Sequence, residues 1–292
     1  MAVSGQTTSD VADDDPDVAR LLEDLRAKSG LKRDELLVRK ITGVLRQRPA
    51  DERAAWVDGL VARPHNDPGW LAFVEAVTVH ETYFFRDPGQ LAVLGQDILP
   101  AVLAAKAAAG RRTLCVWSAG CASGEEAYTV AMMVVDAIAE RGESLAAWSV
   151  SILGSDISRA IVAQAQEGIY GGPGLNAFRR MPARHNVHFT DCGADLPGRR
   201  RISQRLRELV QFEQHNLMEP EPPRTGFDIA LCRNVFIYFD DSSQRRAVAT
   251  LYRGLAAGGF LLLGVTDRLP PGSGFVRQAS GTAVIYRRAG AP

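Results

Sequence analysis

The spacing of apolar residues divides the chain into two differently organised parts. From about Val18 to Val79 hydrophobic positions recur every three or four residues, as on one face of an amphipathic helix, which predicts a small all-helical unit. From Thr113 onward, short continuous apolar runs alternate with helical patterns, and the first run is the predicted strand Thr113–Ser118. Buried strands separated by helices are typical of a mostly parallel sheet covered on both faces.

The second part begins with a predicted helix from about Gly89 to Ala109. Further strands are expected at 148–154, 210–212, 227–232 and 259–264, and further helices at 125–141, 158–167 and 242–256. Residues 275–287 indicate a closing hairpin of antiparallel edge strands. The stretch 170–208, rich in Gly, Pro and Arg, interrupts the alternation, so we interpret it as an inserted small subdomain.

These patterns predict the domain organisation. Residues 1–17 are small, polar and acidic, which indicates a disordered tail. A helical domain over 18–88 and an α/β domain over 89–292 follow, and Asp67 is expected to cap a helix that begins at Pro68. We find no signal peptide and no apolar run of about 18 residues, so we expect a cytoplasmic protein that does not span a membrane.

Composition excludes two classes of function. The 34 basic and 34 acidic residues give a net charge of zero, which argues against nucleic-acid binding through phosphate neutralisation. The four cysteines form no C-x-x-C pair, and the five histidines are not spaced as ligands near them, so we predict free thiols and no metal site.

The turn after the first strand reads SAGCASGEE, from Ser118 to Glu126. Small residues, Gly120 among them, let the backbone approach a ligand at the carboxyl end of the strand. A phosphate-binding loop would have Lys and Ser or Thr where this helix begins with Glu125 and Glu126. Two carboxylates repel phosphate and suit a cationic ligand, although acids at a helix start can also simply favour the helix dipole.

Two later strand ends carry polar residues. Asp156 ends the second strand, where an acid can accept both hydroxyls of a ribose; the alternative is a helix cap in Asp156-Ile157-Ser158. Asn216 and Leu217 follow the strand at 210–212, and an Asn there can read an adenine edge or merely form a turn.

Two further segments bear on the chemistry. Arg233 and Asn234 continue directly from the strand at 227–232, with Tyr238 shortly after, and this set could hold an anionic substrate. The segment 80–88 mixes polar and aromatic residues, including Thr82 and Arg86, at the join between the domains. Its alternative interpretation is an aromatic latch between the two domains with a surface Arg.

Six motifs in sequence resemble the CheR family of chemotaxis-receptor glutamate methyltransferases, over about residues 20–287. They are T-x-F-F-R at 82–86, W-S-A-G-C-A-S-G-E-E-A-Y at 117–128, G-S-D-I-S at 154–158, H-N-L at 215–217, C-R-N-V-x-I-Y-F at 232–239 and G-G-F-L at 258–261.

The resemblance implies a Rossmann-like methyltransferase domain with a small antiparallel subdomain inserted in it, preceded by a helical domain. It implies that S-adenosyl-L-methionine is the cofactor and S-adenosyl-L-homocysteine the product. The implied cofactor contacts are His80, Thr82, Arg86, Gly120, Glu125, Asp156, Asn216, Leu217, Arg233 and Asn234. His80 departs from the family, which typically carries Asn at that position. Arg86 and Tyr238 match positions beside the transferred methyl and are the implied catalytic residues.

The resemblance also implies a partner, the acidic helical methylation region of a chemoreceptor. Residues 26–48 carry eight Lys or Arg against two Asp or Glu, a net charge of +6 that suits an acidic surface, or is simply a solvated helix face. In some relatives the inserted subdomain grips a receptor tether peptide, and the sequence leaves this open here. We expect a monomer.

Three alternatives remain. The chain could methylate a different signalling protein, or bind S-adenosylmethionine or S-adenosylhomocysteine without catalysis as a signalling module. An NAD-dependent dehydrogenase is disfavoured because the loop lacks G-x-G-x-x-G.

Overall fold

A computed structural model describes residues 15–172, 176–280 and 283–290. Residues 1–14 of the predicted tail lie outside the described residues. The last two residues of the predicted tail, Pro16 and Asp17, are already part of a helix. The chain divides into two compact units. The first holds the described residues up to Val79 together with Tyr238–Gln244, and the second holds His80–Ile237 and the residues from Arg245 on. This division falls earlier than the predicted boundary at 88.

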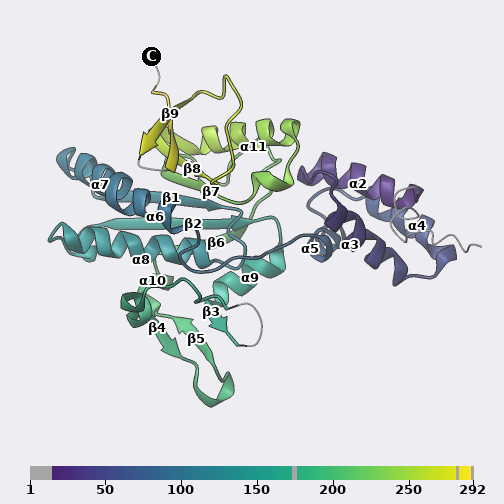
Figure 1. The fold of residues 1–292 in the computed structure, drawn as a ribbon, viewed down its shortest axis with the longest axis horizontal. Coiled ribbons are helices and arrows are strands. Elements are labelled where there is room, and N and C mark those ends of the chain that lie inside the picture. The colour runs from purple at the N-terminus through teal and green to yellow at the C-terminus, as the bar shows by residue number, and fades with distance from the viewer. Residues whose placement is uncertain (1–14, 173–175, 281–282, 291–292) are drawn as a thin grey trace, which may run out of the picture. The chain divides into compact units, whose positions relative to one another are not determined.

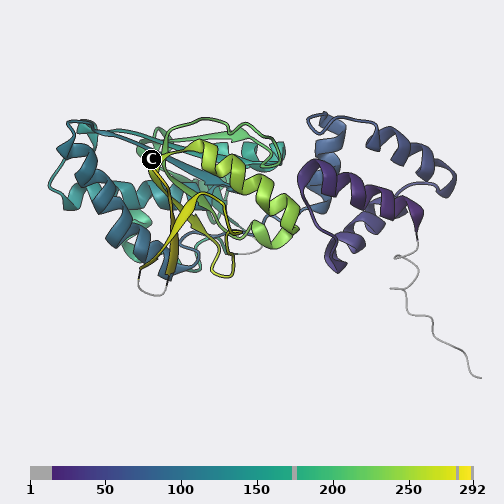
Figure 2. The same ribbon diagram turned by 90° about the horizontal axis from the view of Figure 1, so that it is seen from above.

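The first unit is helical, as its apolar spacing predicts (Figure 2). Its helices are α2 (Pro16–Ser29), α3 (Glu35–Arg46), α4 (Ala50–Val61) and α5 (Pro68–Val77). Helix α5 begins at Pro68 as predicted, because the Asp67 carboxylate accepts the backbone N–H groups of Gly69 and Trp70. The buried Trp70 ring donates through Nε1 to Asp24 Oδ2 at 2.7 Å, which satisfies its one polar atom.

The second unit is built on a mixed sheet in the order β6-β2-β1-β7-β8-β10-β9 (Figure 1). Its strands are β1 (Thr113–Ala119), β2 (Ser149–Asp156), β6 (Val210–Gln214), β7 (Phe227–Cys232), β8 (Leu255–Leu263), β9 (Phe275–Ser280) and β10 (Ala283–Arg288). The strands from β6 to β8 are parallel, and the hairpin β9–β10 adds antiparallel edge strands as predicted. The order reverses beside β1, so ligands are expected at the carboxyl ends of β1 and β7.

Helices pack on this sheet. They are α6 (Pro88–Val93), the π-helical turn η1 (Leu94–Ile98), α7 (Leu99–Ala108), α8 (Glu125–Glu140), α9 (Arg159–Glu167) and α11 (Asp241–Gly254). The continuous helix Pro88–Ala108 is long and apolar enough to cross a membrane, contrary to the expectation that no segment is. Its side chains Leu94, Leu99 and Leu103 are fully buried in the same apolar core as α8, so we assign it to the core.

The segment 170–208 forms the predicted inserted subdomain. A three-stranded antiparallel sheet has the order β3-β5-β4, from β3 (Ile169–Gly171), β4 (Phe189–Asp191) and β5 (Arg199–Ile202). The 3-10 helix η3 (Ala183–His188) leads into β4, and the short helix α10 (Gln204–Arg207) follows β5. Phe178 stacks on Phe84 and meets Phe189 edge to face, which joins the subdomain to the chain just before α6.

Candidate cofactor site

The loop between β1 and α8 is held close to the sheet by its own backbone. Gly120 and Gly124 have φ angles of 75° and 95°, in the left-handed region that favours glycine. A Cβ at Gly124 would lie 2.9 Å from the Phe212 ring, so only glycine fits there. The N–H groups of Gly120 and Cys121 donate to the Ser155 carbonyl at 2.8 and 3.0 Å, which ties the loop to the end of β2.

Asp156 is buried at the end of β2, beside the loop. Its Oδ2 accepts the Ala122 N–H at 2.9 Å and its Oδ1 accepts the Ser158 N–H at 3.1 Å. Ser158 caps α9, so of the two predicted cap residues, Asp and Ser, the serine is confirmed and Asp156 is not the cap. Burial raises the pKa of Asp156, and His80, whose Nδ1 lies 4.0 Å from Oδ1, opposes that rise. The predicted ribose contact stays a prediction for this carboxylate.

The two glutamates that open α8 are in different electrostatic situations. Glu126 accepts from Ser118 Oγ at 2.7 Å and pairs with Arg233 Nη1 at 2.9 Å. Glu125 is only 4% exposed and accepts from Ser123 Oγ at 2.7 Å. Among the described residues, no basic nitrogen forms an ion pair with Glu125 within 4.0 Å. Burial raises the pKa of Glu125, because the charged form loses its solvation. Arg179 acts on this carboxylate only through a longer-range charge effect that lowers its pKa, whereas Glu126 has a cation in direct contact.

The Arg233 side chain is hydrogen-bonded to other groups of the protein. Its guanidinium donates to Gln90 Oε1 at 2.8 Å, Glu126 Oε2 at 2.9 Å, the Arg86 carbonyl at 2.5 Å and Asp87 Oδ2 at 3.2 Å. The side chain is 2% exposed. Arg233 therefore fastens the segment before α6 to the end of β7, and its predicted cofactor contact stays a prediction.

The segment 80–87 packs inside the second unit. The Phe85 N–H donates to Thr129 Oγ1 on α8 at 3.2 Å, and Phe85 and Asp87 have left-handed φ angles of 57° and 55°. Arg86 lies between these two residues, half-buried, and donates from Nη1 to the Glu81 carbonyl at 2.8 Å. Thr82 is also half-buried. The aromatic residues of this segment thus hold it to α8 and to the inserted subdomain, within the second unit, and the predicted latch between the domains stays a prediction.

The turn after β6 contains the buried residues Asn216 and Leu217. Asn216 Oδ1 accepts the Met218 N–H at 3.0 Å, so the turn-forming role is confirmed and the adenine contact remains a prediction. The neighbouring His215 packs edge to face on Trp117. Among the described residues, no hydrogen-bond partner reaches His215 Nε2, which is buried. Sequence reasoning gave His215 no role.

All the predicted cofactor residues belong to the second unit, on the segment before α6 and on the loops after β1, β2, β6 and β7. Asn234, directly after β7 and Arg233, has a left-handed φ of 60°. Tyr238 falls in the first unit, at the end of the 3-10 helix η5 (Phe236–Tyr238), and its carbonyl accepts the Lys32 N–H at 2.8 Å.

The donor set fits S-adenosylmethionine. The buried Glu125 carboxylate suits a positively charged amino group, Asp156 suits ribose hydroxyls and the Asn216 amide suits an adenine edge. The helix start carries no Lys for a phosphate. A doubly wound sheet with these groups at its carboxyl edge defines the class of S-adenosylmethionine-dependent methyltransferases.

Comparison with known proteins gives the family. The profile described as "CheR methyltransferase, SAM binding domain" matches residues 80–285, and this chain belongs to the CheR methyltransferase family. It is 36% identical over 203 residues to chemotaxis protein methyltransferase 1 of Vibrio cholerae serotype O1, covering 68% of each chain. It is 33% identical over 237 residues to chemotaxis protein methyltransferase 1 of Pseudomonas aeruginosa, covering 78% of this chain and 81% of the relative. The predicted family, fold class and cofactor are confirmed.

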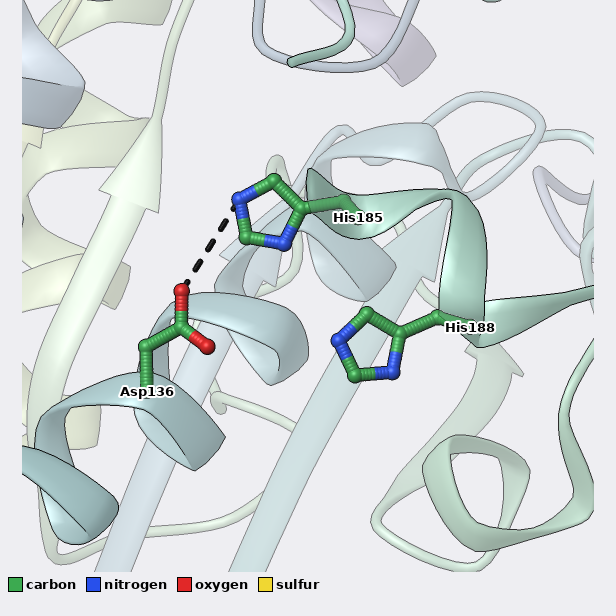
Figure 3. A group of neighbouring side chains, drawn as sticks. All are labelled: Asp136, His185 and His188. Atoms are coloured by element: carbon green, nitrogen blue, oxygen red, sulfur yellow. Dashed lines mark ion pairs between the residues drawn. The ribbon is translucent and has the colours of Figure 1, made fainter. Parts of the chain in front are cut away.

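The structure also brings together three side chains that sequence reasoning did not connect. Asp136 on α8 and His185 and His188 on η3 each offer a ligand atom, and these atoms lie within 4.8 Å of one another (Figure 3). The sequence predicts no metal site, because the histidines have no ligand spacing relative to the cysteines. Here the neighbouring acid lies on a helix about 50 residues earlier in the chain.

Proposed function

We propose that this methyltransferase converts glutamate side chains of a chemoreceptor to γ-glutamyl methyl esters and so adjusts chemotactic signalling. The family and the relatives named chemotaxis protein methyltransferase support this function. The observation that carries it is the buried Glu125 carboxylate, which accepts from a hydroxyl and, among the described residues, has no cation within ion-pair distance. Burying a charge is costly unless a partner compensates it, and the bound cofactor would bring that partner.

The chemistry requires little acid–base help from the protein. Bound S-adenosylmethionine supplies an electrophilic methyl group on a sulfonium. The substrate carboxylate is already ionised at pH 7, so no residue of this chain has to act as a strong general base. Transfer to the substrate would form an ester C–O bond at the expense of the cofactor's C–S bond, with S-adenosylhomocysteine as the product. The enzyme's contribution is then positioning and exclusion of water.

Each proposed contact has a distinct task. Glu125 holds the amino group of the cofactor, Asp156 its ribose hydroxyls, and Asn216 with Leu217 its adenine. Arg86 orients a carboxylate, either that of the cofactor or that of the substrate. Tyr238 donates a hydrogen bond to the substrate oxygen. His80, Thr82, Gly120, Arg233 and Asn234 complete the proposed cofactor shell.

The proposed partner is the acidic helical methylation region of the receptor, met by basic residues between 26 and 48. Some of these cations have partners in their own unit: Lys40 donates to the Thr78 carbonyl, and the Arg48 guanidinium lies 3.7 Å from the centroid of the Trp56 ring. Arg26 and Arg39 also form ion pairs, with Asp240 and Glu35. The exposed side chains of the set are those of Arg26, Lys32, Arg33, Arg39 and Arg46. These would steer an acidic partner, with strong salt dependence. We propose a cytoplasmic monomer.

Calorimetry and methyl transfer test this function together. The wild-type chain should bind S-adenosylmethionine and S-adenosylhomocysteine, and should transfer labelled methyl groups to a receptor fragment as a base-labile ester. Arg86→Ala and Tyr238→Phe should lower transfer while Tyr238→Phe keeps cofactor affinity. Binding with transfer only to another protein would favour a different signalling substrate. Binding without any transfer would favour a non-catalytic module, and full activity in both variants would refute the assigned roles.

A further inference from the structure

A cluster of two imidazoles and one carboxylate lies between α8 and the inserted subdomain, and the methyl-transfer proposal does not use it. His185 and His188 project from η3 and Asp136 from α8, and Figure 3 shows the three side chains turned toward one another. His185 Nε2 is 3.8 Å from Asp136 Oδ2. That separation is too long for a hydrogen bond, so these two groups do not satisfy each other directly.

The central side chain of this cluster has an unmet bonding requirement. His185 is 1% exposed, and among the described residues its Nε2 has no hydrogen-bond partner. The ring is held in place by stacking on Phe85, with centroids 4.5 Å apart. A buried polar atom is normally paired with protein, water or an ion. The His185 Nε2 atom is therefore a fixed ligand atom that points at a carboxylate without bonding to it.

We propose that Asp136, His185 and His188 bind a divalent cation of the zinc class, with a water as fourth ligand. Imidazole nitrogen with a single carboxylate is a ligand set that suits Zn²⁺ and disfavours Mg²⁺ and Ca²⁺, which prefer oxygen ligands. In a tetrahedral zinc site the ligand atoms are about 3.4 Å apart, given metal–ligand bonds of about 2.1 Å. The observed separations of up to 4.8 Å therefore require a contraction of up to about 1.4 Å.

The two other ligands have the freedom to make that contraction. Asp136 has a side chain 37% exposed, and His188 is half-buried, so both can change rotamer around the fixed His185. Burial also lowers the pKa of both imidazoles, which favours the neutral form that binds metals. Arg184 Nε lies 3.8 Å from Asp136 Oδ2, so a bound cation would displace a weak, solvent-exposed ion pair.

The site would have a structural consequence. Asp136 belongs to the helix that begins at Glu125, whereas η3 leads directly into strand β4 of the inserted sheet. A shared metal ion would thus cross-link the inserted subdomain to the helix that opens at the cofactor loop. It would act on stability and local order, since none of the three ligands belongs to the proposed cofactor or catalytic set.

Zinc titration of the full chain, freed of any affinity tag and treated with chelator, tests this site. With a chromophoric chelator as competitor, the wild-type chain should take up one equivalent of Zn²⁺. Asp136→Asn and His188→Gln should each weaken the affinity at least tenfold. Glu140→Gln, an exposed carboxylate one turn further along α8, and His65→Gln should bind as the wild type does. These controls separate the cluster from adventitious binding to surface groups and cysteines.

A second measurement localises the effect. At a Zn²⁺ concentration about 100-fold above Kd, Tm should rise by roughly 5 °C or more in the wild type and in neither ligand variant. Hydrogen exchange should slow in η3 and β4. Unchanged S-adenosylmethionine affinity in the metal-free variants would confirm that they are folded. A wild type without a stoichiometric zinc site, or ligand variants that bind zinc as tightly as the wild type, would overturn the proposal.

Discussion

The loop after β1 and the turn after β7 lie at the same edge of the sheet, yet they use their charges differently. After β7, the buried Arg233 guanidinium pairs with Glu126 and Asp87 and also donates to Gln90 and to a backbone carbonyl. After β1, the buried Glu125 has a hydroxyl donor and, among the described residues, no cation within ion-pair distance. Charge at a strand end is therefore no guide to ligand binding until its protein partners are known.

The largest effect on stability should come from replacing Arg233, whose charge is paired with groups of the protein itself. Arg233→Met leaves Glu126 and Asp87 without their cation and should destabilise the fold by about 3 kcal/mol. Thermal unfolding should then show a Tm lower by roughly 6–12 °C. The exposed Arg111→Met should shift stability by no more than about 0.5 kcal/mol. An unchanged Tm in Arg233→Met would mean that the network does not hold the segment before α6 in place.

The next effect distinguishes the two glutamates by ligand affinity. Glu125→Gln removes the proposed partner of the cofactor's amino group and should weaken S-adenosylmethionine binding roughly 100-fold, with little change in Tm. Glu126→Gln should instead lower the stability of the fold and leave the S-adenosylmethionine affinity within about threefold of the wild type. Calorimetry beside thermal unfolding measures both. Equal losses of affinity in the two variants would contradict the assignment of the cationic contact to Glu125.

The pH dependence of binding should sharpen the same contrast. The cofactor's amino group needs the ionised carboxylate, and burial raises the pKa of Glu125. Affinity should therefore be constant at neutral pH and fall by about tenfold per pH unit once the pH drops below that raised pKa. The fall should begin at a higher pH than for an exposed glutamate. Burial also raises the pKa of Asp156, and this residue is still present in Glu125→Gln. Any loss of affinity at low pH that the wild type shows and this variant does not is therefore due to Glu125.

The smallest effect concerns the departure from the family pattern. His80→Asn supplies a primary amide, with two N–H donors beside a carbonyl acceptor, where neutral imidazole offers one donor and one acceptor on separate ring atoms. The variant should therefore bind S-adenosylmethionine about threefold more tightly. Calorimetric titration of the variant and the wild type under the same conditions measures the difference. Weaker binding in the variant would show that His80, which lies 4.0 Å from Asp156, already serves the site.

Much of the fold could be predicted because its strands are buried. Continuous apolar runs mark β1 and β7 within a residue or two, and the glycine-rich interruption marks the inserted subdomain. The start of β8 at Leu255 could not be predicted. Its first residues, which include Gly258 and Gly259, carry no apolar pattern. Among them only Leu255 is paired with β7, opposite Phe227, and the register resumes at Phe260 opposite Ile229 after an irregularity.

The site could be predicted only where its signal is local. The loop from Gly120 to Glu125 indicates a ligand-binding site, because small residues are followed by acids within one short stretch. The role of Arg233 depends on Gln90 and Glu126, which are 143 and 107 residues away in the sequence. The cluster of Asp136 with two histidines is equally non-local. Such partners are set by the packing of elements, which spacing along the chain does not encode.

The position of β1 in the middle of the sheet has a consequence for biosynthesis. Its neighbour β2 follows soon after, but its other neighbour, β7, begins only at Phe227. At about 5–20 residues per second the ribosome needs roughly 5–20 s to make the intervening chain. During that interval the edge of β1 that later pairs with β7 has no partner strand, and the apolar side chains that will pack against β7 stay exposed to solvent. A nascent-chain chaperone that shields this edge should therefore raise the yield of folded enzyme.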